Sequence, residues 1–307
     1  MPASEGTESQ LDGLLDRWRA DLAAWAIPEH ITAAVAESPW VLPTQVFARR
    51  ADAVSAAPAG VSFELAWAAL DPPGSVIDVG SGAGAASLPL AARTTELTAV
   101  DSSEAMLDLL GERAAARGLP LRRVRGAWPQ VADQVPVADV VTCHHVVYNV
   151  ADLKPFLLAL TSHARRLVVI ETTTVHPLVS LNQLWRKFHG LIRPEGPTSG
   201  DLLAILAAMG ITCQLRTWRR PGGPDYPSMG ELADVTRRRL CLPPDRAGDV
   251  ADALVEAGIN PARPADLGSS GREVTTIWWN SSAQDSVHDG PADLAAEASC
   301  CRDDVTM

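Results

Sequence analysis

Short apolar runs alternate with longer amphipathic stretches through the middle of the chain. Runs rich in Val, Ile and Leu are typical of strands buried on both faces, and the stretches between them carry apolar residues at helical spacing. Strand alternating with helix predicts an α/β fold with a doubly wound, mostly parallel sheet. The predicted strands are 75–79, 96–100, 121–126, 138–144 and 166–171, and the predicted helices are 85–93, 103–117 and 153–162.

The regular alternation stops after the fifth predicted strand. Apolar residues then recur at helical spacing between Pro177 and Pro194. Two later strands, 211–218 and 273–279, complete a predicted sheet of seven strands. Helical insertions therefore interrupt the second half of the sheet, around 176–200 and 221–270.

The first part of the chain is predicted to be mostly helical, because apolar residues recur at helical spacing from Leu11 to Trp25 and again up to Leu70. We interpret 1–70 as an N-terminal helical cap in front of a core that spans 71–280. Residues 281–307 are small, polar and acidic, which predicts a disordered tail.

The composition is that of an ordinary globular protein, with 307 residues of which 47% are hydrophobic and 21% charged. No apolar run approaches the ~20 residues that a membrane-spanning helix needs. Residues 1–6 lack the basic and apolar segments of a secretory signal, so we expect none. The net charge of −11 argues against broad binding to nucleic acid, although Arg237-Arg238-Arg239 is either a local patch or an ion-paired face.

The cysteines give no sign of a disulfide framework or a metal site. There are 5 of them, an odd number, and none lies in a Cys-x-x-Cys pair or at a Cys/His ligand spacing. We therefore expect no metal and a reducing, cytoplasmic environment. Arginine far outnumbers lysine, which occurs only at Lys154 and Lys187, and alanine is abundant; both biases indicate a GC-rich bacterial gene.

A glycine-rich turn follows the first predicted strand and is the most informative motif. It contains Gly80, Gly82 and Gly84, which let the backbone pass close to a ligand. The helix predicted at 85–93 would direct its N-terminal amides at the same ligand. Asp101 ends the second strand, where an acid accepts hydrogen bonds from both hydroxyls of a ribose. Together these features predict a nucleoside-containing cofactor across the carboxyl ends of the strands.

The pattern over residues 75–279 resembles the class I S-adenosylmethionine (SAM)-dependent methyltransferases. The run Asp78-Val79-Gly80-Ser81-Gly82-Ala83-Gly84 is similar to the first motif of that family, and Asp101 matches its ribose-binding acid. Residues 139–144 resemble its fourth strand, which often starts with an acid and ends at the active site. The two late strands resemble its closing antiparallel pair. The resemblance implies SAM as the cofactor and methyl transfer as the reaction.

The resemblance also implies where the cofactor lies. The glycine turn and Asp78 would hold its methionine end, Asp101 would bind the ribose, and Ser102 and Met106 would flank the adenosine. The cofactor-binding residues implied in this way are Asp78, Gly80, Ser81, Gly82, Gly84, Asp101, Ser102, Met106, Ala127, Trp128 and His144.

The sequence departs from the family pattern at the adenine. Many members carry an acid after the third strand that bonds the adenine amino group, whereas this chain has Gly126-Ala127-Trp128 there. Trp128 either stacks on the adenine or packs in the core, and the sequence leaves both alternatives open.

Two other classes of function fit part of the same pattern. Gly80, Gly82 and Ala85 also match Gly-x-Gly-x-x-Ala, a dinucleotide signature of NAD(P)-dependent oxidoreductases. The acid at Asp78, the helical cap and the strand–insertion–strand ending favour SAM instead. A regulator that binds SAM without catalysis is the third hypothesis. Stabilisation by SAM and S-adenosylhomocysteine (SAH), but not by NAD, distinguishes a SAM protein from an oxidoreductase.

The candidate catalytic residues follow the fourth predicted strand, where a doubly wound fold opens onto its ligand crevice. Methyl transfer from SAM is an in-line displacement, so the enzyme mainly aligns the acceptor and excludes water. His144 or His145 would take a proton from an acceptor of high pKa, and Tyr148 and Asn149 would orient that acceptor. Each histidine has the alternative of a hydrogen-bonded packing residue.

Three further groups have a functional and a structural interpretation. Glu171 and His176, after the fifth strand, face the crevice, or Glu171 pairs with an arginine of the cap. The segment 176–194 forms an acceptor lid or packs as a plain helix. Arg49 and Arg50 reach the SAM carboxylate or make surface ion pairs.

The acidic balance favours a small-molecule acceptor, and a helical cap with a large insertion suits an enclosed substrate. Methylation of RNA or protein is the alternative, with the arginine clusters as the contact surface. The sequence leaves open the choice among O-, N- and C-methylation, and also the oligomeric state.

Overall fold

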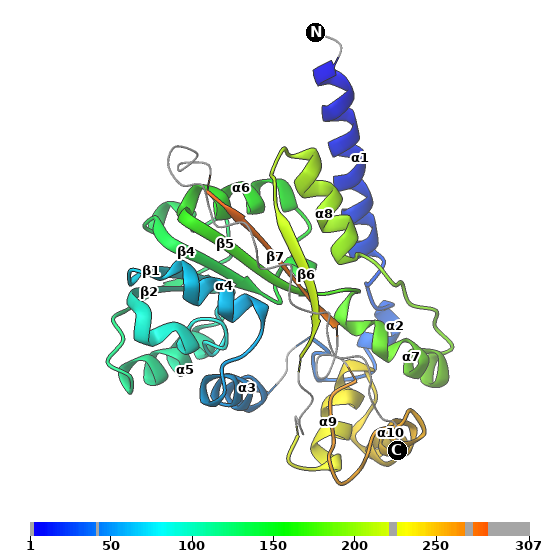
Figure 1. The fold of residues 1–307 in the computed structure, drawn as a ribbon. Helices are drawn as coiled ribbons and strands as arrows, with labels where there is room; N and C mark the ends of the chain where they lie inside the picture. The colour runs from blue at the N-terminus through cyan, green and yellow to red at the C-terminus, as the bar shows by residue number, and fades with distance from the viewer. Residues whose placement is uncertain (1–2, 41–42, 221–225, 268–272, 282–307) are drawn as a thin grey trace, which may run out of the picture.

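The computed structural model describes residues 3–40, 43–220, 226–267 and 273–281 (Figure 1). A seven-stranded sheet with the order β3-β2-β1-β4-β5-β7-β6 runs through the molecule, and β7 is antiparallel to both of its neighbours. The mostly parallel sheet predicted from the sequence is thereby confirmed. Its strands are β1 (Gly74–Val79), β2 (Thr94–Asp101), β3 (Leu121–Arg125), β4 (Ala138–His144), β5 (Ala164–Thr173), β6 (Gln214–Arg219) and β7 (Glu273–Asn280).

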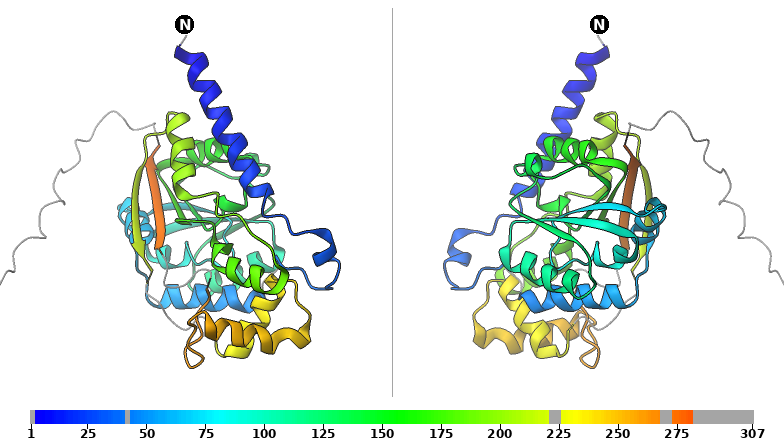
Figure 2. Two further views of the ribbon diagram at one scale, coloured as in Figure 1. Left: turned by 90° about the vertical axis from the view of Figure 1, so that its right-hand side faces the viewer. Right: turned by 90° about the vertical axis from the view of Figure 1, so that its left-hand side faces the viewer.

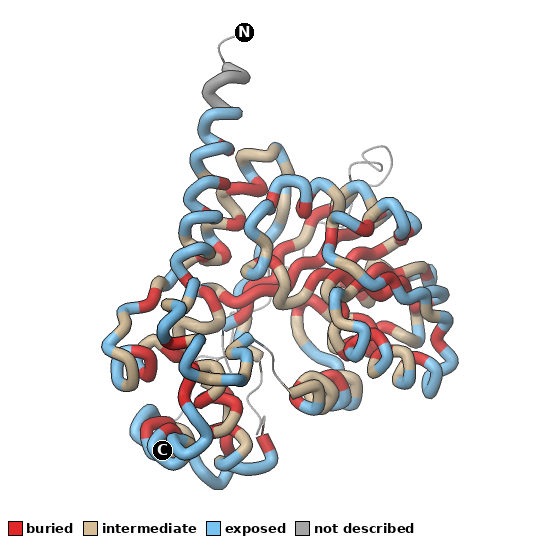
Figure 3. Tube along the Cα trace, turned by 180° about the vertical axis from the view of Figure 1, so that it is seen from behind, coloured by how far each residue is buried: buried red, intermediate tan, exposed pale blue. Residues whose placement is uncertain are grey.

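Helices cover both faces of the sheet, as the doubly apolar strands require. On one face α1 (Ala3–Ala23), α6 (Leu153–His163) and α8 (Ser199–Ala208) bury side chains such as Ile77 and Val141. On the other face α4 (Val61–Ala69) and α5 (Glu104–Ala115) bury Val76 and Val140. Neighbouring residues of one strand thus enter different clusters, because successive side chains point to opposite faces. Figure 3 shows the buried strands at the centre and exposed outer helix faces.

The predicted N-terminal helices lie on different sides of the molecule. Helix α1 packs on α8 and inserts Leu11, Leu15 and Trp18 into the cluster on its face, while its N-terminal end projects beyond the sheet (Figure 2). Helix α4 packs on β4 and β5 from the opposite face. The division of the chain at residue 70 therefore stays a prediction, and its tail, 282–307, lies outside the described residues.

A third apolar cluster lies apart from the two clusters of the sheet. It is formed by five helices, which we call the lid: α2 (Glu29–Thr32), α3 (Thr44–Ala56), α7 (Asn182–His189), α9 (Met229–Arg239) and α10 (Ala247–Glu256). Its buried residues include Ile31, Val46, Trp185 and Leu254. The short 3₁₀ helix η4 (Pro177–Leu181), which soon follows the carboxyl end of β5, leads into α7. The lid therefore lies at the carboxyl ends of the strands, where the ligand crevice is expected (Figure 1).

The α-helix expected at 85–93 is wrong. Residues 82–87 form a series of turns, and only Leu88–Arg93 is helical, as the 3₁₀ helix η1. Pro89 lies in the first turn of η1, and inside an α-helix it would remove one backbone hydrogen bond and collide with the preceding turn. The turn after β1 is therefore not followed by an α-helix whose amides point at the ligand.

Among the described residues, no helix is both long and apolar enough to cross a membrane.

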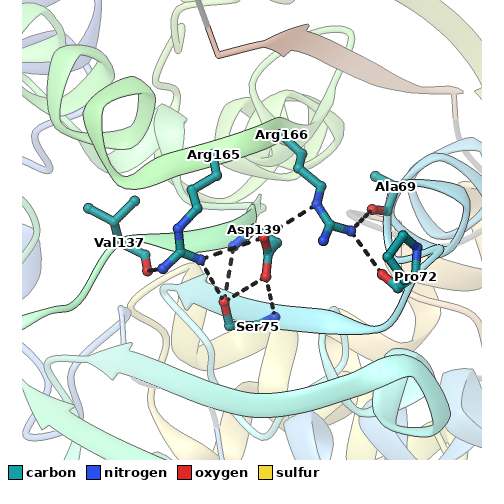
Figure 4. Close-up of polar contacts among 7 residues, drawn as sticks. All are labelled: Ala69, Pro72, Ser75, Val137, Asp139, Arg165 and Arg166. Carbon is teal, nitrogen blue, oxygen red and sulfur yellow. Dashed lines mark hydrogen bonds and ion pairs between the residues drawn. The ribbon is translucent and has the colours of Figure 1, made fainter. Parts of the chain in front are cut away.

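A carboxylate ties together the amino ends of three neighbouring strands (Figure 4). Asp139 on β4 accepts hydrogen bonds from the backbone N–H of Ser75 at 2.8 Å and from its hydroxyl at 3.0 Å. On β5, Arg166 Nε lies 3.3 Å and Arg165 Nη1 3.6 Å from the other carboxylate oxygen. A Cβ at Gly74 would approach Asp139 to 2.5 Å, so the first residue of β1 has to be small. Burial opposes ionisation, but the Ser75 and arginine contacts lower the pKa of Asp139.

We expect Asp139→Ala to lower the free energy of unfolding by about 2–3 kcal/mol, because it leaves a partly buried N–H and two guanidinium groups without their acceptor. Urea unfolding at neutral pH measures the loss. Asp133→Ala, at an exposed aspartate of η2 (Ala132–Gln134), is the control and should change stability by less than about 0.5 kcal/mol. Equal effects of the two substitutions would contradict a stabilising role for the contacts of Asp139.

Candidate active site

The turn after β1 is held in left-handed backbone conformations. The φ angles of Gly80, Gly82 and Gly84 are 71°, 50° and 90°. The amides of Gly80 and Ser81 donate to the Val100 carbonyl at 2.8 and 3.1 Å, which fixes the turn against β2. The glycines are thus required by the backbone itself.

The three glycines differ in what surrounds them. A Cβ at Gly80 would lie 2.2 Å from Val146, and one at Gly84 would lie 2.7 Å from Leu88, so these two glycines allow close packing. A Cβ at Gly82 would meet nothing within 4 Å. The hydroxyl of Ser81 is buried and has no hydrogen-bond partner among the described residues. An open face at Gly82 beside an unsatisfied hydroxyl is the arrangement expected of a cradle for a polar ligand.

Asp101 joins this cradle to the next element. Its two carboxylate oxygens accept hydrogen bonds from the amides of Gly82 and Ser103, each at 2.8 Å. Ser103 also caps α5 by accepting from the amide of Met106. Each carboxylate oxygen keeps a further lone pair, so Asp101 has acceptors left for ribose hydroxyls.

The residues implied for the adenine differ in their exposure. Ser102 and Ala127 are exposed, and Met106 is buried. Trp128 is 7% exposed, its indole donates to the Phe156 carbonyl at 3.3 Å, and its ring meets His163 edge-on. The Trp128 ring is therefore packed in the core, and nothing in its contacts supports stacking on the adenine.

Asp78 lies in the strand itself and is 1% exposed. Ser87 Oγ donates to it at 2.6 Å and Thr142 Oγ1 lies 3.2 Å away. Burial raises the pKa of Asp78 to about 6 in spite of these two hydrogen bonds, and the negative charge of Asp101 adds to the rise. A buried acid with a pKa this close to neutrality would ionise more fully beside a positively charged ligand.

The two adjacent histidines after β4 have different surroundings. His144 lies beside Glu171 of β5 in the sheet, and its buried Nε2 has no hydrogen-bond partner among the described residues. Burial lowers the pKa of His144 to about 4, so the ring is neutral at pH 7. His145 has a φ of 60°, which is uncommon for a residue with a Cβ, and burial lowers its pKa as well. Its Nε2 lies 3.1 Å from Glu171 Oε1 and 2.9 Å from Arg220 Nη2.

Glu171 is the centre of a buried polar network. It forms an ion pair with Arg220, which follows β6, and accepts a 2.5 Å hydrogen bond from Ser62 of α4. Ser62 in turn contacts Thr276 of β7, which accepts from the Trp218 indole. Burial alone would raise the pKa of Glu171, but the two histidines and Arg220 hold it well below its ordinary range. The sequence identified Glu171 but not this partner, because Arg220 follows β6 and does not belong to the N-terminal helices.

Tyr148 lies close to His145 and to a second aromatic group. Its ring centroid is 6.4 Å from that of His145 and 5.6 Å from that of His176, which stacks on Trp25 at 4.1 Å. Asn149 lies with Tyr148 in the 3₁₀ helix η3 (Val147–Asn149), but it is exposed. The structure therefore brings His145 and Tyr148 together and leaves Asn149 at the surface.

The two arginines expected either at the cofactor or in surface ion pairs are ion-paired. Arg49 pairs with Glu231 of α9, and Arg50 donates to Asp266 at 2.9 Å. The first contact joins α3 to α9, and the second joins α3 to the segment after α10. Across the described ranges, no group of three His, Cys, Asp or Glu side chains lies close enough to hold a metal ion.

Comparison with known proteins finds a match within the core. Residues 76–168 match a family model described as a methyltransferase domain. A ubiquinone biosynthesis O-methyltransferase of Rickettsia conorii is 28% identical over 90 residues, which cover 29% of this chain and 31% of that protein. The chain thus matches about a third of the length of this curated relative.

Solved structures with a similar fold include YcgJ of Bacillus subtilis, at 18% identity and a TM-score of 0.48, with coverage of 71% of this chain and 97% of that one. The magnesium protoporphyrin IX methyltransferase of Synechocystis with bound SAH follows at 21% identity and 0.41, covering 66% and 86%.

Residues 76–168 therefore carry a methyltransferase domain, and the glycine turn and Asp101 lie within it.

We expect Asp78→Asn to remove a pH dependence from the stability of the ligand-free protein. The pKa of Asp78 is about 6 in the folded state against an ordinary 3.8, so the folded state binds more protons between these values. Stability from this group is therefore lost as the pH rises from about 4 to about 6, by about 3 kcal/mol in total.

Urea unfolding of the variant and the native chain at about pH 4 and pH 7 tests this. The difference in unfolding free energy should shift by about 3 kcal/mol in favour of the variant at the higher pH. Asp133→Asn, at an exposed position, should show no such shift. A constant difference for Asp78→Asn would contradict a raised pKa.

Proposed function

We propose that this chain transfers a methyl group from SAM to a small-molecule acceptor. The observation that carries the proposal is the pairing of Gly82 with Asp101. A Cβ at Gly82 would meet nothing within 4 Å, so the backbone is open to a ligand there. Asp101 accepts from the Gly82 amide and keeps acceptors for a ribose. Both lie at the carboxyl ends of adjacent parallel strands, the usual ligand position in doubly wound sheets.

The chain's own groups match the parts of the cofactor. Asp101 would accept from the ribose hydroxyls, and the unsatisfied Ser81 hydroxyl would bond the methionine end. Asp78 would face the positive charge of that end, which favours its ionised form. The exposed Ala127 leaves room for the adenine.

SAM supplies a methyl group already activated on a sulfonium, so the protein has to align the acceptor and exclude water. The lid would provide the enclosure, since it lies where the strands end. His145 and Tyr148 would meet the acceptor. The lowered pKa of His145 keeps its ring neutral, as a group that takes a proton from an acceptor must be. His144, with its unpartnered Nε2, is the second candidate for this role.

A small acceptor is favoured over RNA or protein. Arg237 and Arg238 pair with Glu37 and Asp234, and Arg123 pairs with Asp108, so these arginine runs are largely neutralised. The relatives are named for methylation in ubiquinone biosynthesis and for methylation of magnesium protoporphyrin IX, both small molecules. The free thiols of Cys143, Cys213 and Cys241 suit a reducing compartment such as the bacterial cytoplasm.

We expect SAM and SAH to raise the midpoint of thermal unfolding, and NAD to leave it unchanged. At a ligand concentration 100 times Kd the stabilisation is about 2.7 kcal/mol, which corresponds to several degrees. Differential scanning calorimetry with the three ligands measures this. Stabilisation by NAD alone would support an oxidoreductase, and the absence of any shift with SAM and SAH would refute the proposed function.

We expect Gly82→Ala to weaken SAH binding at least about tenfold, because the new methyl group enters the cradle. Gly118→Ala is a matched control. Gly118 also has a positive φ, 63°, and open space at the Cβ position, but it lies after α5 and away from the turn. Both substitutions should cost about 1–2 kcal/mol of stability through backbone strain. Isothermal titration should show lower SAH affinity for Gly82→Ala only, and equal affinities would argue against the cradle.

A further inference from the structure

Helix α9 ends with three consecutive arginines whose surroundings are not alike. Arg237 contacts Glu37 at 2.5 Å and Asp234 at 2.7 Å, and Arg238 contacts the same two carboxylates at 3.1 Å each. Arg239 has one ion pair among the described residues, to Asp266 at 3.8 Å, and donates no hydrogen bond there. Its side chain is nevertheless only 17% exposed.

Arg50 of α3 contacts the same carboxylate from another direction, with a 2.9 Å hydrogen bond from Nη2 to Asp266 Oδ2. The side chain of Arg50 is 27% exposed, and that of Asp266 is 5% exposed. Two half-buried guanidinium groups therefore share one carboxylate. Each guanidinium has five N–H donors, and most of these ten donors have no acceptor in the described part of the chain.

The two arginines belong to lid helices α3 and α9, and their charges act on the candidate acceptor groups. The positive charges of Arg239, Arg50 and Arg220 all act on the Tyr148 hydroxyl, although burial outweighs them and raises the pKa of Tyr148. Arg50 and Arg220 also act on His145. Arg220 is neutralised by its ion pair with Glu171. Among these described groups, three arginines face two carboxylates, and the uncompensated charge belongs to Arg50 and Arg239.

We propose that Arg50 and Arg239 bind an anionic group of the methyl acceptor, a carboxylate or a phosphate, and that Tyr148 and His145 contact the rest of that acceptor. The proposal rests on the proposed function for the identity of the reaction, but the anion site itself stands on the two guanidinium groups. Planar guanidinium groups with unused donors match the paired oxygens of such anions. An aromatic acid fits best, because the Tyr148 and His145 side chains are rings whose centroids lie 6.4 Å apart.

The carboxylate of SAM is another anion that Arg50 and Arg239 could bind. Neither guanidinium hydrogen-bonds to the glycine turn in the described structure, and both arginines belong to helices of the lid. The unsatisfied Ser81 hydroxyl offers the methionine end a different partner. These positions favour the acceptor as the source of the anion.

The first test compares three probes of similar shape and different charge: benzoate, benzamide and benzylammonium. Isothermal titration on the native chain, with and without saturating SAH, should show benzoate binding at least about tenfold more tightly than the other two. Added sodium chloride should weaken benzoate binding, because it screens the arginines. Equal affinities, a preference for benzylammonium, or no benzoate binding at tens of millimolar would overturn the proposal.

The second test uses single substitutions. Arg239→Gln and Arg50→Gln should each weaken benzoate at least about tenfold and leave SAH affinity unchanged. The matched control is Arg49→Gln, at the neighbouring arginine whose partner is Glu231, and it should bind benzoate as the native chain does. Arg239→Gln is the safer variant, since Asp266 then keeps its 2.9 Å contact with Arg50.

The outcomes separate the two proposals. If Arg50→Gln or Arg239→Gln weakens SAH and benzoate shows no preference, the arginines hold the cofactor and the anionic acceptor is refuted. If the native chain prefers benzoate but binds neither SAM nor SAH, the anion site survives and the proposed function fails. If the native chain binds SAH but shows no preference for benzoate, the proposed function survives and the anion site fails.

Discussion

The carboxylate of Asp101 is the contact on which the candidate site depends. It holds the amide of Gly82 from one loop and the amide of Ser103 from the next, so one side chain sets the distance between the turn after β1 and the start of α5. A ligand at the open face of Gly82 needs a backbone of fixed position, and the Asp101 contacts supply it. The same oxygens keep lone pairs beyond these two contacts, which is why we propose Asp101 as the group that binds the ribose.

Two polar networks at opposite ends of the strands have different chemistry. At the amino ends, Asp139 is ionised and saturated by Ser75 and two arginines, which is typical of a structural contact. At the carboxyl ends, the groups are less completely satisfied. Within the described residues, His144 Nε2 and Ser81 Oγ have no hydrogen-bond partner, and burial raises the pKa of Asp78. Unsatisfied buried groups cost free energy, and groups with shifted pKa values are frequent at ligand sites, so these three residues support the carboxyl ends as the candidate site.

Much of the fold could be predicted from the sequence, because apolar strands and helix signals are local. The strand at 138–144 and the helix expected from residue 103 are present, the latter as α5. The sequence predicted an α-helix at 85–93, but the structure has only the short 3₁₀ helix η1 there. Pro89 is compatible with the first turn of a helix but not with its interior, so its effect depends on where the helix begins. Partners such as Arg220 for Glu171, or Phe156 for Trp128, come from distant segments, and only the assembled sheet brings them together.

The lid has an apolar cluster of its own, separate from the two clusters that flank the sheet. Internal ion pairs add to it, from Arg49 to Glu231 and from Arg237 to Glu37. Helix α3 of the lid is also held to α5 by the ion pair of Asp52 with Arg113, so the lid is fastened to a helix that covers the sheet. A displacement of the whole lid against the sheet would have to break this contact.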